Sequence, residues 1–342
     1  MSDPFSEITE RIRGFISGEP EDFDGLANDL FALQFEHVPP YRQFCESRET
    51  IPADTNTIPA ISTSAFRDYE ITSLSETDRP FVFHSSGTTG QTPSRHYHNL
   101  ESSRLYEHSL ETAFTKCLPP TPRTFSLAPP PAEAPHSSLV HMMNVVQSQP
   151  IFTGTVTPQG WQVNTEPTVR QLRTADAPVT IMGTAFSFVQ LCDAIEPMKL
   201  PAGSRVMETG GYKNQSRELP KAELHALIAA TLNVPPENIH CEYGMCELSS
   251  QAYAIGTGLF RFPHWAQARI VSPENSAEVA IGETGLLEVI DLANVRSALA
   301  IRTADLAVRH ADGFELLGRS AGAEPRGCSL NAIGTKSLPA HA

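Results

Sequence analysis

The sequence predicts an α/β protein, in which helices cover a largely parallel sheet and a smaller β-rich part follows. Between about residues 80 and 254, short apolar segments alternate with amphipathic helical segments, a pattern typical of parallel sheets. After about residue 255 the polarity alternates, turn glycines recur and helical periodicity is weak. The 342 residues, 40% of them hydrophobic and 19% charged, are enough to bury a large core.

We expect four segments along the chain. The first is helical, because apolar residues between Leu26 and Phe35 recur at near-helical spacing until the proline pair at 39–40. The stretch IPADTNTIPAIS after it is expected to be an extended connector. The expected segments are an N-terminal helical part (1–57), an α/β core (58–254), a β-rich subdomain (255–332) and a tail (333–342).

The charge balance limits the partners of the protein. There are 25 basic and 39 acidic residues, which give a net charge of −14. This charge argues against sequence-independent binding to nucleic acid or to an anionic membrane. The acidic start MSDPFSEITERIRGF lacks the features of a signal peptide, and no run approaches the roughly 18 apolar residues of a membrane span. Because the six cysteines are scattered, we expect a cytoplasmic protein with free thiols.

A loop of small residues follows the first predicted strand of the core. Phe81-Val82-Phe83 predicts that strand, and the segment 102–118 predicts a helix. The loop between them contains Ser85, Ser86, Gly87, Thr88, Thr89 and Gly90. Such residues let backbone N–H groups approach an anion, and a helix N-terminus directly after the loop favours negative charge. The loop lacks the Gly-Lys ending of a Walker loop, so alone it predicts either a phosphate site or a solvated polar turn.

Further segments continue the α/β pattern. The proline-rich segment 118–135 is either a linker or a loop that contains a short strand. The segment 179–195 predicts a buried strand, a Gly-Thr turn and a helix, and the segment 221–234 predicts an amphipathic helix. A short strand, Ile239-His240-Cys241, follows.

Two polar loops follow strands of this core. Gly210 and Gly211 follow the strand-like Arg205-Val206-Met207, and the stretch EYGMCEL (242–248) follows the strand at 239–241. Open sheets bind ligands at such strand ends. A tyrosine can stack on a flat base, a glycine permits close backbone approach, and a carboxylate can hold Mg²⁺ together with phosphate oxygens. Together the loops predict a nucleotide site.

These motifs resemble those of the adenylate-forming superfamily. SSGTTG, the TGG turn, YGMCEL, IRTAD (301–305) and Gly318-Arg319 occur in the order and rough spacing of that superfamily, whose enzymes convert a carboxylic acid and ATP into acyl-AMP and pyrophosphate. Four longer stretches resemble the acyl-protein synthetases of bacterial luminescence, the fatty-acid-activating component of a fatty acid reductase complex: LAPPPAEAPHSSLVHMM, METGGYKNQSRELP, EYGMCELSSQAY and LLGRSAGAEPRGCSL. The resemblance covers about residues 58 to 332. It implies the large N-terminal domain of these enzymes, with the C-terminal lid domain absent or vestigial.

The resemblance also implies roles for individual residues, with ATP and Mg²⁺ as cofactors. The loop Ser85 to Gly90 is expected to hold the β- and γ-phosphates. Gly210, Gly211 and Tyr243 are expected to bind adenine, and Gly244 is expected to allow close backbone approach. Glu247 is expected to bind Mg²⁺. Asp305 is expected to bind the ribose, with Arg319 near the ribose and the phosphates.

The chain departs from the superfamily pattern at two points. Cys246 stands where a threonine is usual, and a thiol is a much poorer hydrogen-bond donor to an α-phosphate or acyl oxygen. Full-length members also use a lysine from their C-terminal domain in adenylation. Lys336 is the single lysine beyond Lys221, so it is the candidate here, with a solvated tail residue as the alternative.

Cys328 is the candidate acyl acceptor. Acyl-protein synthetases that resemble this chain carry a cysteine near the C-terminus that accepts the acyl group as a thioester. Arg326 could stabilise a thiolate, and Gly327 would let the segment bend toward the acyl-adenylate. The alternative is an ordinary buried thiol. Ser138 and His141 are candidates for the fatty-acid pocket, His141 being otherwise a packed core histidine.

The function expected from these features is ATP-dependent activation of a fatty acid, followed by acyl transfer to Cys328 and then to a reductase-like partner protein. One alternative is an acyl-CoA ligase resembling phenylacetate–CoA ligases, with CoA as acceptor. Another is a non-catalytic member of the fold that binds nucleotide or an acyl group.

Other candidate sites are weaker. Cys241 and Cys246 with His240 lack the second ligand pair of a structural zinc site, and the G-x-S-x-G stretch at 318–322 lacks the helix of a hydrolase elbow. His96 and His98, after the small-residue loop, are expected to be exposed, with a contact between one of them and a phosphate as the alternative.

Overall fold

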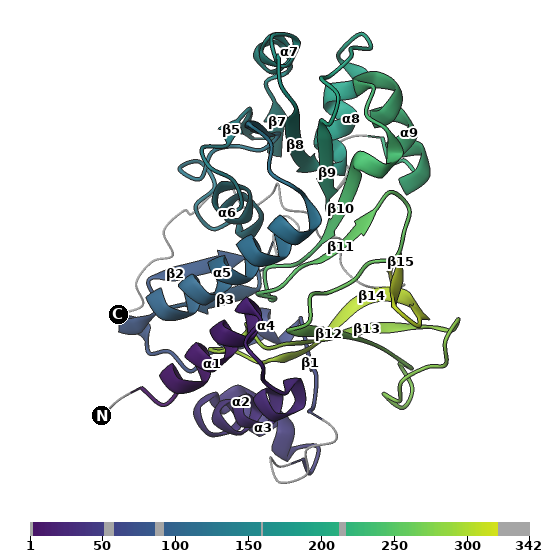
Figure 1. Cartoon of the computed structure of the whole chain (residues 1–342). Helices are drawn as coiled ribbons and strands as arrows, with labels where there is room; N and C mark the ends of the chain where they lie inside the picture. Colours follow the sequence, from purple (N-terminus) through teal and green to yellow (C-terminus); the bar gives the residue numbers. More distant parts are fainter. Residues whose placement is uncertain (1–2, 51–57, 86–91, 159, 212–216, 321–342) are drawn as a thin grey trace.

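The computed structural model describes residues 3–50, 58–85, 92–158, 160–211 and 217–320 of the chain. Two sheets form its centre, a six-stranded sheet in the upper half of Figure 1 and a five-stranded sheet in the lower half. The six-stranded sheet contains β4 (Arg123–Ser126), β5 (Ile151–Phe152), β8 (Val179–Thr184), β9 (Arg205–Thr209), β10 (Ile239–Tyr243) and β11 (Ala252–Ile255). The five-stranded sheet contains β1 (Ile61–Ser62), β12 (Ala266–Val271), β13 (Thr284–Asp291), β14 (Ala300–His310) and β15 (Gly313–Arg319).

Two hairpins and a set of helices complete the structure. The hairpins pair β2 (Phe81–His84) with β3 (Arg95–His98) and β6 (Gly154–Thr157) with β7 (Gly160–Val163). The helices are α1 (Ser6–Ser17), α2 (Phe23–His37), α3 (Pro39–Glu46), α4 (Ala65–Asp68), α5 (Leu100–Cys117), α6 (Ser138–Val145), α7 (Thr165–Arg173), α8 (Ala185–Asp193) and α9 (Lys221–Leu232). Short 3₁₀ turns lie at Glu76–Asp78 and Pro236–Asn238. Among the described residues, no helix is both long and apolar enough to cross a membrane.

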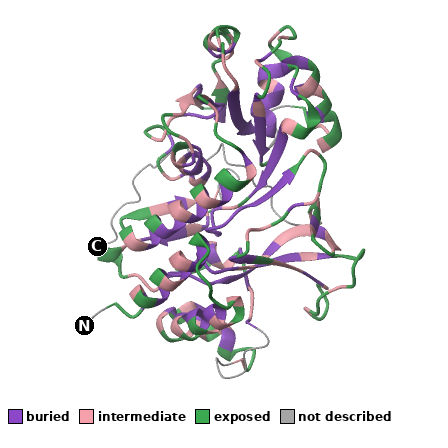
Figure 2. Ribbon diagram, in the orientation of Figure 1, coloured by how far each residue is buried: buried purple, intermediate pink, exposed green. Residues whose placement is uncertain are grey.

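The six-stranded sheet confirms the predicted parallel α/β core. Its strand order is β11-β10-β9-β8-β4-β5, and every neighbouring pair is parallel except the pair that β11 forms with β10. On one face, Ile181, Val206 and Ile239 pack with apolar residues of α8 and α9. On the other face, Met182 and Met207 belong to a cluster that includes residues of α5 and α6. Because both faces are covered, nearly all residues of these central strands are buried (Figure 2).

The second sheet confirms the predicted β-rich part. Its strands follow the order β1-β14-β13-β12, and β15 pairs with β14. The short β1 comes from near residue 60, so an early segment extends the late sheet. Gln34 of α2 ties the N-terminal helices to the loop before β14, because its side chain donates to Asn294 O (2.7 Å) and accepts from Leu299 N (2.8 Å).

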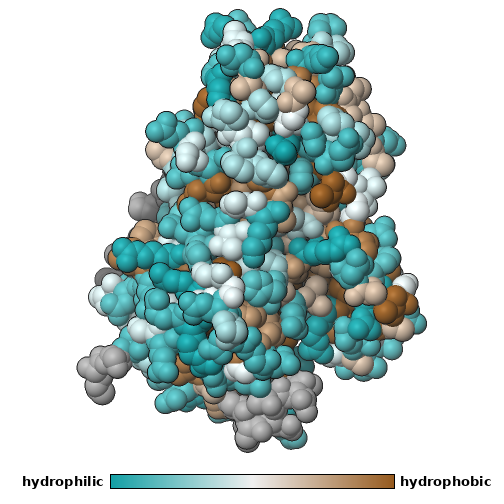
Figure 3. Space-filling model, viewed as in Figure 1, coloured by the Kyte–Doolittle hydropathy of each residue, from teal (hydrophilic) through white to brown (hydrophobic). Residues whose placement is uncertain are grey.

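Hydrophobic side chains on the surface shown in Figure 3 lie in small separate patches among hydrophilic residues. Among the described residues, six large apolar side chains are exposed, and they come from distant parts of the chain: Tyr69, Phe81, Leu100, Ile255, Ile281 and Leu317. Isolated apolar residues of this kind are normal on a protein surface and indicate no particular partner.

Two expectations for the region after the first strand are wrong. The loop at 85–90 was expected to run directly into a helix, but β3 lies between the loop and α5 and pairs antiparallel with β2. α5, capped by Asn99, therefore follows β3 and not the loop, so the expected strand–loop–helix unit is not formed. His96 and His98 were expected to be exposed, yet they are 1% and 2% exposed, because β3 is covered by α5.

Candidate active site

The carboxyl ends of β8, β9 and β10 form one edge of the six-stranded sheet. Parallel register places Thr184 beside Thr209, and Thr209 beside Glu242. The two loops singled out in the sequence, at Gly210–Gly211 and at 244–248, therefore leave neighbouring strands at the same edge. Gly210 has a φ of +67°, a conformation that favours glycine.

Tyr243, Asp305 and Arg319 meet where the two sheets approach each other. The Tyr243 hydroxyl donates to Oδ2 of Asp305 at 2.7 Å, and Nε of Arg319 lies 3.7 Å from Oδ1 of the same carboxylate. Asp305 and Arg319 are register partners of β14 and β15. The structure thus brings together three residues that the sequence separated by up to 76 positions.

Aromatic side chains surround Tyr243. The ring centroids of Phe260, Phe262 and Phe314 lie 6.1, 6.4 and 5.9 Å from that of Tyr243, all in edge-to-face contact. Tyr243 is 8% exposed. These contacts fix the orientation of the tyrosine ring at the strand end.

Glu242 fills the space behind the glycine of the same loop. Its side chain is buried, accepts a hydrogen bond from the hydroxyl of Thr209, and has a pKa that burial raises to about 7. A Cβ on Gly244 would overlap Oε1 of Glu242 and press on Gln251. Gly244 itself is exposed, so its backbone remains open to a ligand.

Two residues that the sequence did not identify hold the loop after Tyr243. Nδ1 of His96 donates to the carbonyl of Cys246 at 2.8 Å, and Nδ2 of Asn294 donates to the carbonyl of Glu247 at 2.8 Å. Burial lowers the pKa of His96 to about 4, so the ring is neutral at pH 7 and Nε2 accepts from Ser297 Oγ at 3.2 Å. No spacing in the sequence links His96 to a loop 150 residues away.

Glu247 and Cys246 are themselves buried. Glu247 is 0% exposed and Cys246 is 6% exposed. The bonds from His96 and Asn294 to the carbonyls of Cys246 and Glu247 fix the backbone of this loop.

Aromatic and histidine rings line the space between β2, β3, α5 and α6. The ring of Tyr106 stacks with the rings of His98 and His141, with centroid distances of 5.6 and 5.8 Å. His141 also contacts the ring of Phe83 at 5.1 Å, and its Nε2 lies 3.2 Å from Glu107. Burial and the neighbouring histidines lower the pKa of His98 well below its usual value, so it too is neutral.

The first turn of α6 carries the other candidate for acid binding. Ser138 is its first residue and is half-buried, whereas Ser137 caps the helix by accepting from Val140 N at 3.2 Å. His141 is one turn further along and is half-buried. The two candidates therefore lie close together on one short helix.

Several expected site residues lie outside the described part of the chain. They are Ser86, Gly87, Thr88, Thr89, Gly90, Cys328 and Lys336. Ser85 is described: its backbone N donates to Ser94 O at 3.0 Å, and its hydroxyl accepts from Ser94 N at 2.8 Å.

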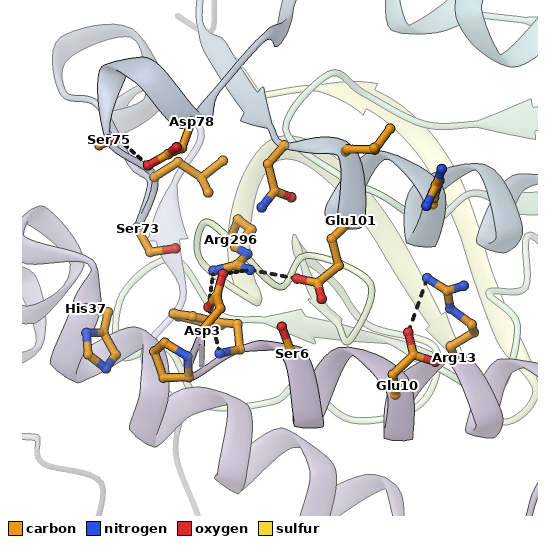
Figure 4. A pocket seen from close by; sticks show the side chains of 16 residues that line it. Asp3, Ser6, Glu10, Arg13, His37, Ser73, Ser75, Asp78, Glu101 and Arg296 are labelled. Atoms are coloured by element: carbon orange, nitrogen blue, oxygen red, sulfur yellow. Dashed lines mark hydrogen bonds and ion pairs between the residues drawn. The ribbon is translucent and has the colours of Figure 1, made fainter. Parts of the chain in front are cut away.

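A polar cavity of about 890 Å³ lies elsewhere, between the start of α1 and the start of α5 (Figure 4). At its centre Arg296 pairs with Asp3 at 2.5 Å and with Glu101 at 2.7 Å. Figure 4 also shows Arg13 paired with Glu10 among the residues that line this cavity. Since carboxylates of the chain already pair with these two arginines, we do not place the active site here.

Comparison with known proteins identifies the family. The family model described as "Acyl-protein synthetase, LuxE" matches residues 23–334. Two relatives carry the name "Long-chain-fatty-acid--luciferin-component ligase", one from Aliivibrio fischeri and one from Vibrio harveyi. Each is 22% identical to this chain; the first alignment covers 90% of this chain and 87% of the relative, and the second covers 90% and 86%.

The fold is similar to that of solved ligases. An open conformation of 2-hydroxyisobutyryl-CoA ligase in complex with 2-HIB-AMP and CoA matches with a TM-score of 0.63 and 13% identity, over 85% of this chain and 74% of that one. The thioesterification state of the same enzyme gives a TM-score of 0.62 at 13% identity, over 92% and 67%. These matches confirm the predicted adenylate-forming fold, and the family match confirms the resemblance found in the motifs. The chain is a ligase and belongs to the acyl-protein synthetase family, LuxE.

Proposed function

We propose that this protein uses ATP to convert a fatty acid into acyl-AMP and pyrophosphate, and then transfers the acyl group to a protein thiol. One observation carries the proposal: Gly210 and Gly211 follow β9 at the edge where Tyr243 ends the neighbouring β10, and Tyr243 is hydrogen-bonded to Asp305 of the other sheet. The family match and the relatives named as fatty-acid ligases support the choice of substrate.

In this proposal, the adenine ring lies between the Gly210–Gly211 backbone and Tyr243. Open glycine backbone allows a flat base to approach, and the three phenylalanines around Tyr243 keep its ring in place. The carboxylate of Asp305 binds the ribose hydroxyls, while the guanidinium of Arg319, 3.7 Å from that carboxylate, is close to the phosphates.

The phosphates occupy the region of Ser85 to Gly90 and Glu247. Glu247 fits a Mg²⁺ ligand, because its side chain offers only oxygen acceptors when ionised and its backbone is fixed by Asn294. When bound with ATP, Mg²⁺ neutralises charge on the phosphate oxygens. An acidic chain with few lysines can bind ATP in this way, with backbone amides, hydroxyls and a metal ion.

Adenylation then requires mainly positioning. A carboxylate oxygen of the fatty acid attacks the α-phosphorus; the new O–P bond forms as the bond to the β-phosphate oxygen breaks, and pyrophosphate leaves with the electron pair. No proton is transferred, so the neutral imidazoles of His96 and His98 do not need to act as acid or base. His96 instead positions the loop that carries Cys246 and Glu247.

Acyl transfer follows in the second step. Cys328 loses its proton to solvent, and the thiolate sulfur attacks the acyl carbon; the bond from that carbon to the AMP oxygen breaks, and AMP leaves. Lys336 is the candidate for charge neutralisation during adenylation. Ser138 and His141 are proposed to line the acid pocket, where the buried Met142 and Met143 beside them supply an adaptable apolar wall.

Labelled fatty acid tests the acyl transfer. Wild-type protein incubated with the acid, ATP and Mg²⁺ should retain label after denaturation, and neutral hydroxylamine should release it. Cys328→Ser should lose this label but still form acyl-AMP, while Cys117→Ser, at a partly exposed thiol on α5, should keep it. Equal labelling of wild type and Cys328→Ser would refute the acceptor assignment.

The same incubation separates the two alternative functions. A product that forms only when CoA is added would indicate an acyl-CoA ligase. Absence of acyl-AMP with every acid tested would indicate a non-catalytic binding protein, the alternative that the replacement of threonine by Cys246 favours.

A further inference from the structure

Three metal-binding side chains meet on the α9 side of the six-stranded sheet. They are Glu208 of β9, His225 of α9 and Cys241 of β10, and their ligand atoms all lie within 4.8 Å of one another. The three residues are 7%, 6% and 1% exposed. A carboxylate, an imidazole and a thiol that lose their contacts with water are satisfied either by bonding to one another or by sharing a metal ion.

The separations between these atoms fit a metal ion. Nε2 of His225 lies 3.4 Å from Oε1 of Glu208 and 3.5 Å from Sγ of Cys241. The distance between His225 and Glu208 exceeds the 2.7–3.2 Å that is typical of an N–H···O hydrogen bond. Hydrogen bonds to sulfur are longer, so the distance to Cys241 alone does not distinguish the two kinds of contact. With zinc bonds of about 2.0–2.1 Å to N and O and about 2.3 Å to S, tetrahedral ligands are separated by about 3.3–3.6 Å.

The topology of the sheet creates this arrangement. Glu208 and Cys241 are register partners on neighbouring parallel strands, so their side chains point to the same face. That face is covered by α9, on which His225 is one turn from the N-terminus beside the buried Leu224. Residues at 208, 225 and 241 have no metal-motif spacing, which explains why the sequence argued against zinc at Cys241.

We propose that Glu208, His225 and Cys241 bind one Zn²⁺ ion, with a water molecule as the fourth ligand. A mixed set of oxygen, nitrogen and sulfur donors suits this borderline-soft cation, whereas Mg²⁺ prefers oxygen alone. On binding, the Sγ–H bond of Cys241 breaks, its proton passes to solvent and the sulfur bonds to zinc. One carboxylate and one thiolate then balance the two positive charges of the ion.

Two contacts of Cys241 compete with the ion. Its Sγ donates to the carbonyl of Gly256 at 3.3 Å, a weak bond that is lost when the thiol proton leaves. The ammonium of Lys221, which lies 4.5 Å from the Phe260 ring centroid, also interacts with Cys241. This cation repels a metal ion, so Lys221 sets the affinity of the site.

The ion would support the nucleotide edge without taking part in the reaction. Glu208 directly precedes Thr209 and Gly210, and Cys241 precedes Glu242 and Tyr243. Zinc would cross-link these two strands to α9, just below the loops proposed to hold adenine. This site is separate from the Mg²⁺ ligand Glu247, so the two proposals fail independently.

Metal binding by purified full-length protein tests the inference. After removal of metal with a chelator, Co²⁺ is added as a spectroscopic probe and Zn²⁺ affinity is measured by competition. We expect one metal per chain, a near-ultraviolet thiolate-to-cobalt absorption band, and an increase in melting temperature with Zn²⁺. Cys241→Ser should abolish the band and weaken Zn²⁺ binding at least about 100-fold.

Matched variants keep the test decisive. Cys192→Ser removes another buried thiol of the same half of the protein and should keep the band. Lys221→Met should tighten Zn²⁺ binding. If Cys241→Ser does not fold, His225→Gln replaces it and should weaken binding to the same extent. Absence of stoichiometric metal in both the wild type and Lys221→Met, or an unchanged cobalt band in Cys241→Ser, would overturn the proposal.

Discussion

The hydroxyl of Tyr243 donates a 2.7 Å hydrogen bond to Oδ2 of Asp305, and this bond joins the two sheets of the protein. Tyr243 ends β10 of the six-stranded sheet, and Asp305 lies in the middle of β14 of the five-stranded sheet. In the proposed function one partner faces adenine and the other binds ribose. The bond therefore sets the distance between the two halves of the nucleoside site.

Tyr243→Phe keeps the ring but removes this bond. We expect the KM for ATP to rise about tenfold. A hydrogen bond to a charged group typically contributes about 1.5–3 kcal/mol, and Asp305 regains part of this energy when it binds the ribose hydroxyls. The matched control is Tyr253→Phe, since the Tyr253 hydroxyl is buried with no hydrogen-bond partner among the described residues. Equal KM values for Tyr243→Phe and the wild type would show that the bond does not organise the site.

Cys246→Thr restores the hydroxyl that is usual in the superfamily. We expect adenylation to become several-fold faster, because a hydroxyl donates a stronger hydrogen bond than a thiol to a phosphate or acyl oxygen. Cys246→Val has nearly the same shape as threonine without the donor, so it should be no faster than the wild type. If threonine and valine gave the same rate, the side chain at 246 would not act as a donor. Single-turnover formation of acyl-AMP measures all three proteins.

Gly244→Ala should disturb the nucleotide edge. The added Cβ overlaps Oε1 of Glu242, which is held by Thr209, so the loop or the carboxylate must move. We expect a loss of about 1–3 kcal/mol in stability and a clear rise in KM for ATP. A double-mutant cycle with Glu242→Ala checks the cause, because the second change removes the obstructing atom. Additive effects in this cycle would contradict the proposed clash.

Glu242 makes stability depend on pH. Its pKa is raised by burial from 4.5 to about 7, so the folded protein keeps this proton longer than the unfolded chain does. The stability that this group contributes is complete below pH 4.5 and is lost as pH rises through 7. Glu242→Gln cannot ionise, so its stability relative to the wild type should increase between pH 5 and pH 8, by on the order of 3 kcal/mol.

Urea unfolding of both proteins at these two pH values measures the effect. Glu237→Gln, at an exposed position in the turn before β10, controls for the loss of one negative charge. A constant difference between Glu242→Gln and the wild type at both pH values would mean that Glu242 is ionised throughout.

Local patterns predicted the sheet and part of the site. The strands at 81–83, 205–207 and 239–241 and the helix at 221–234 follow from short apolar runs and helical spacing, and the structure contains β2, β9, β10 and α9 there. The ordered motifs predicted the family, and the resemblance assigned Tyr243, Asp305 and Arg319 to one nucleotide site; the structure shows that these three side chains lie together. Patterns of this kind work because strand ends in parallel sheets meet at one edge.

Contacts between distant segments could not be predicted. β3 has histidines at alternate positions, which suggests an exposed polar strand, but the covering α5 is visible only in three dimensions. The bonds from His96 and Asn294 to the loop at 244–248 join segments 150 and about 50 residues apart. The cluster of Glu208, His225 and Cys241 depends on strand register and on the position of α9, neither of which is encoded in local spacing.

Acid-dependent exchange of labelled pyrophosphate into ATP tests the central claim most directly. With Mg²⁺ and a series of fatty acids, the wild type should catalyse exchange only when an acid is present. Glu247→Gln should lower the rate at least about 100-fold, while Glu237→Gln should keep it. Exchange that is absent with every acid tested, or that is unchanged in Glu247→Gln, would contradict the account.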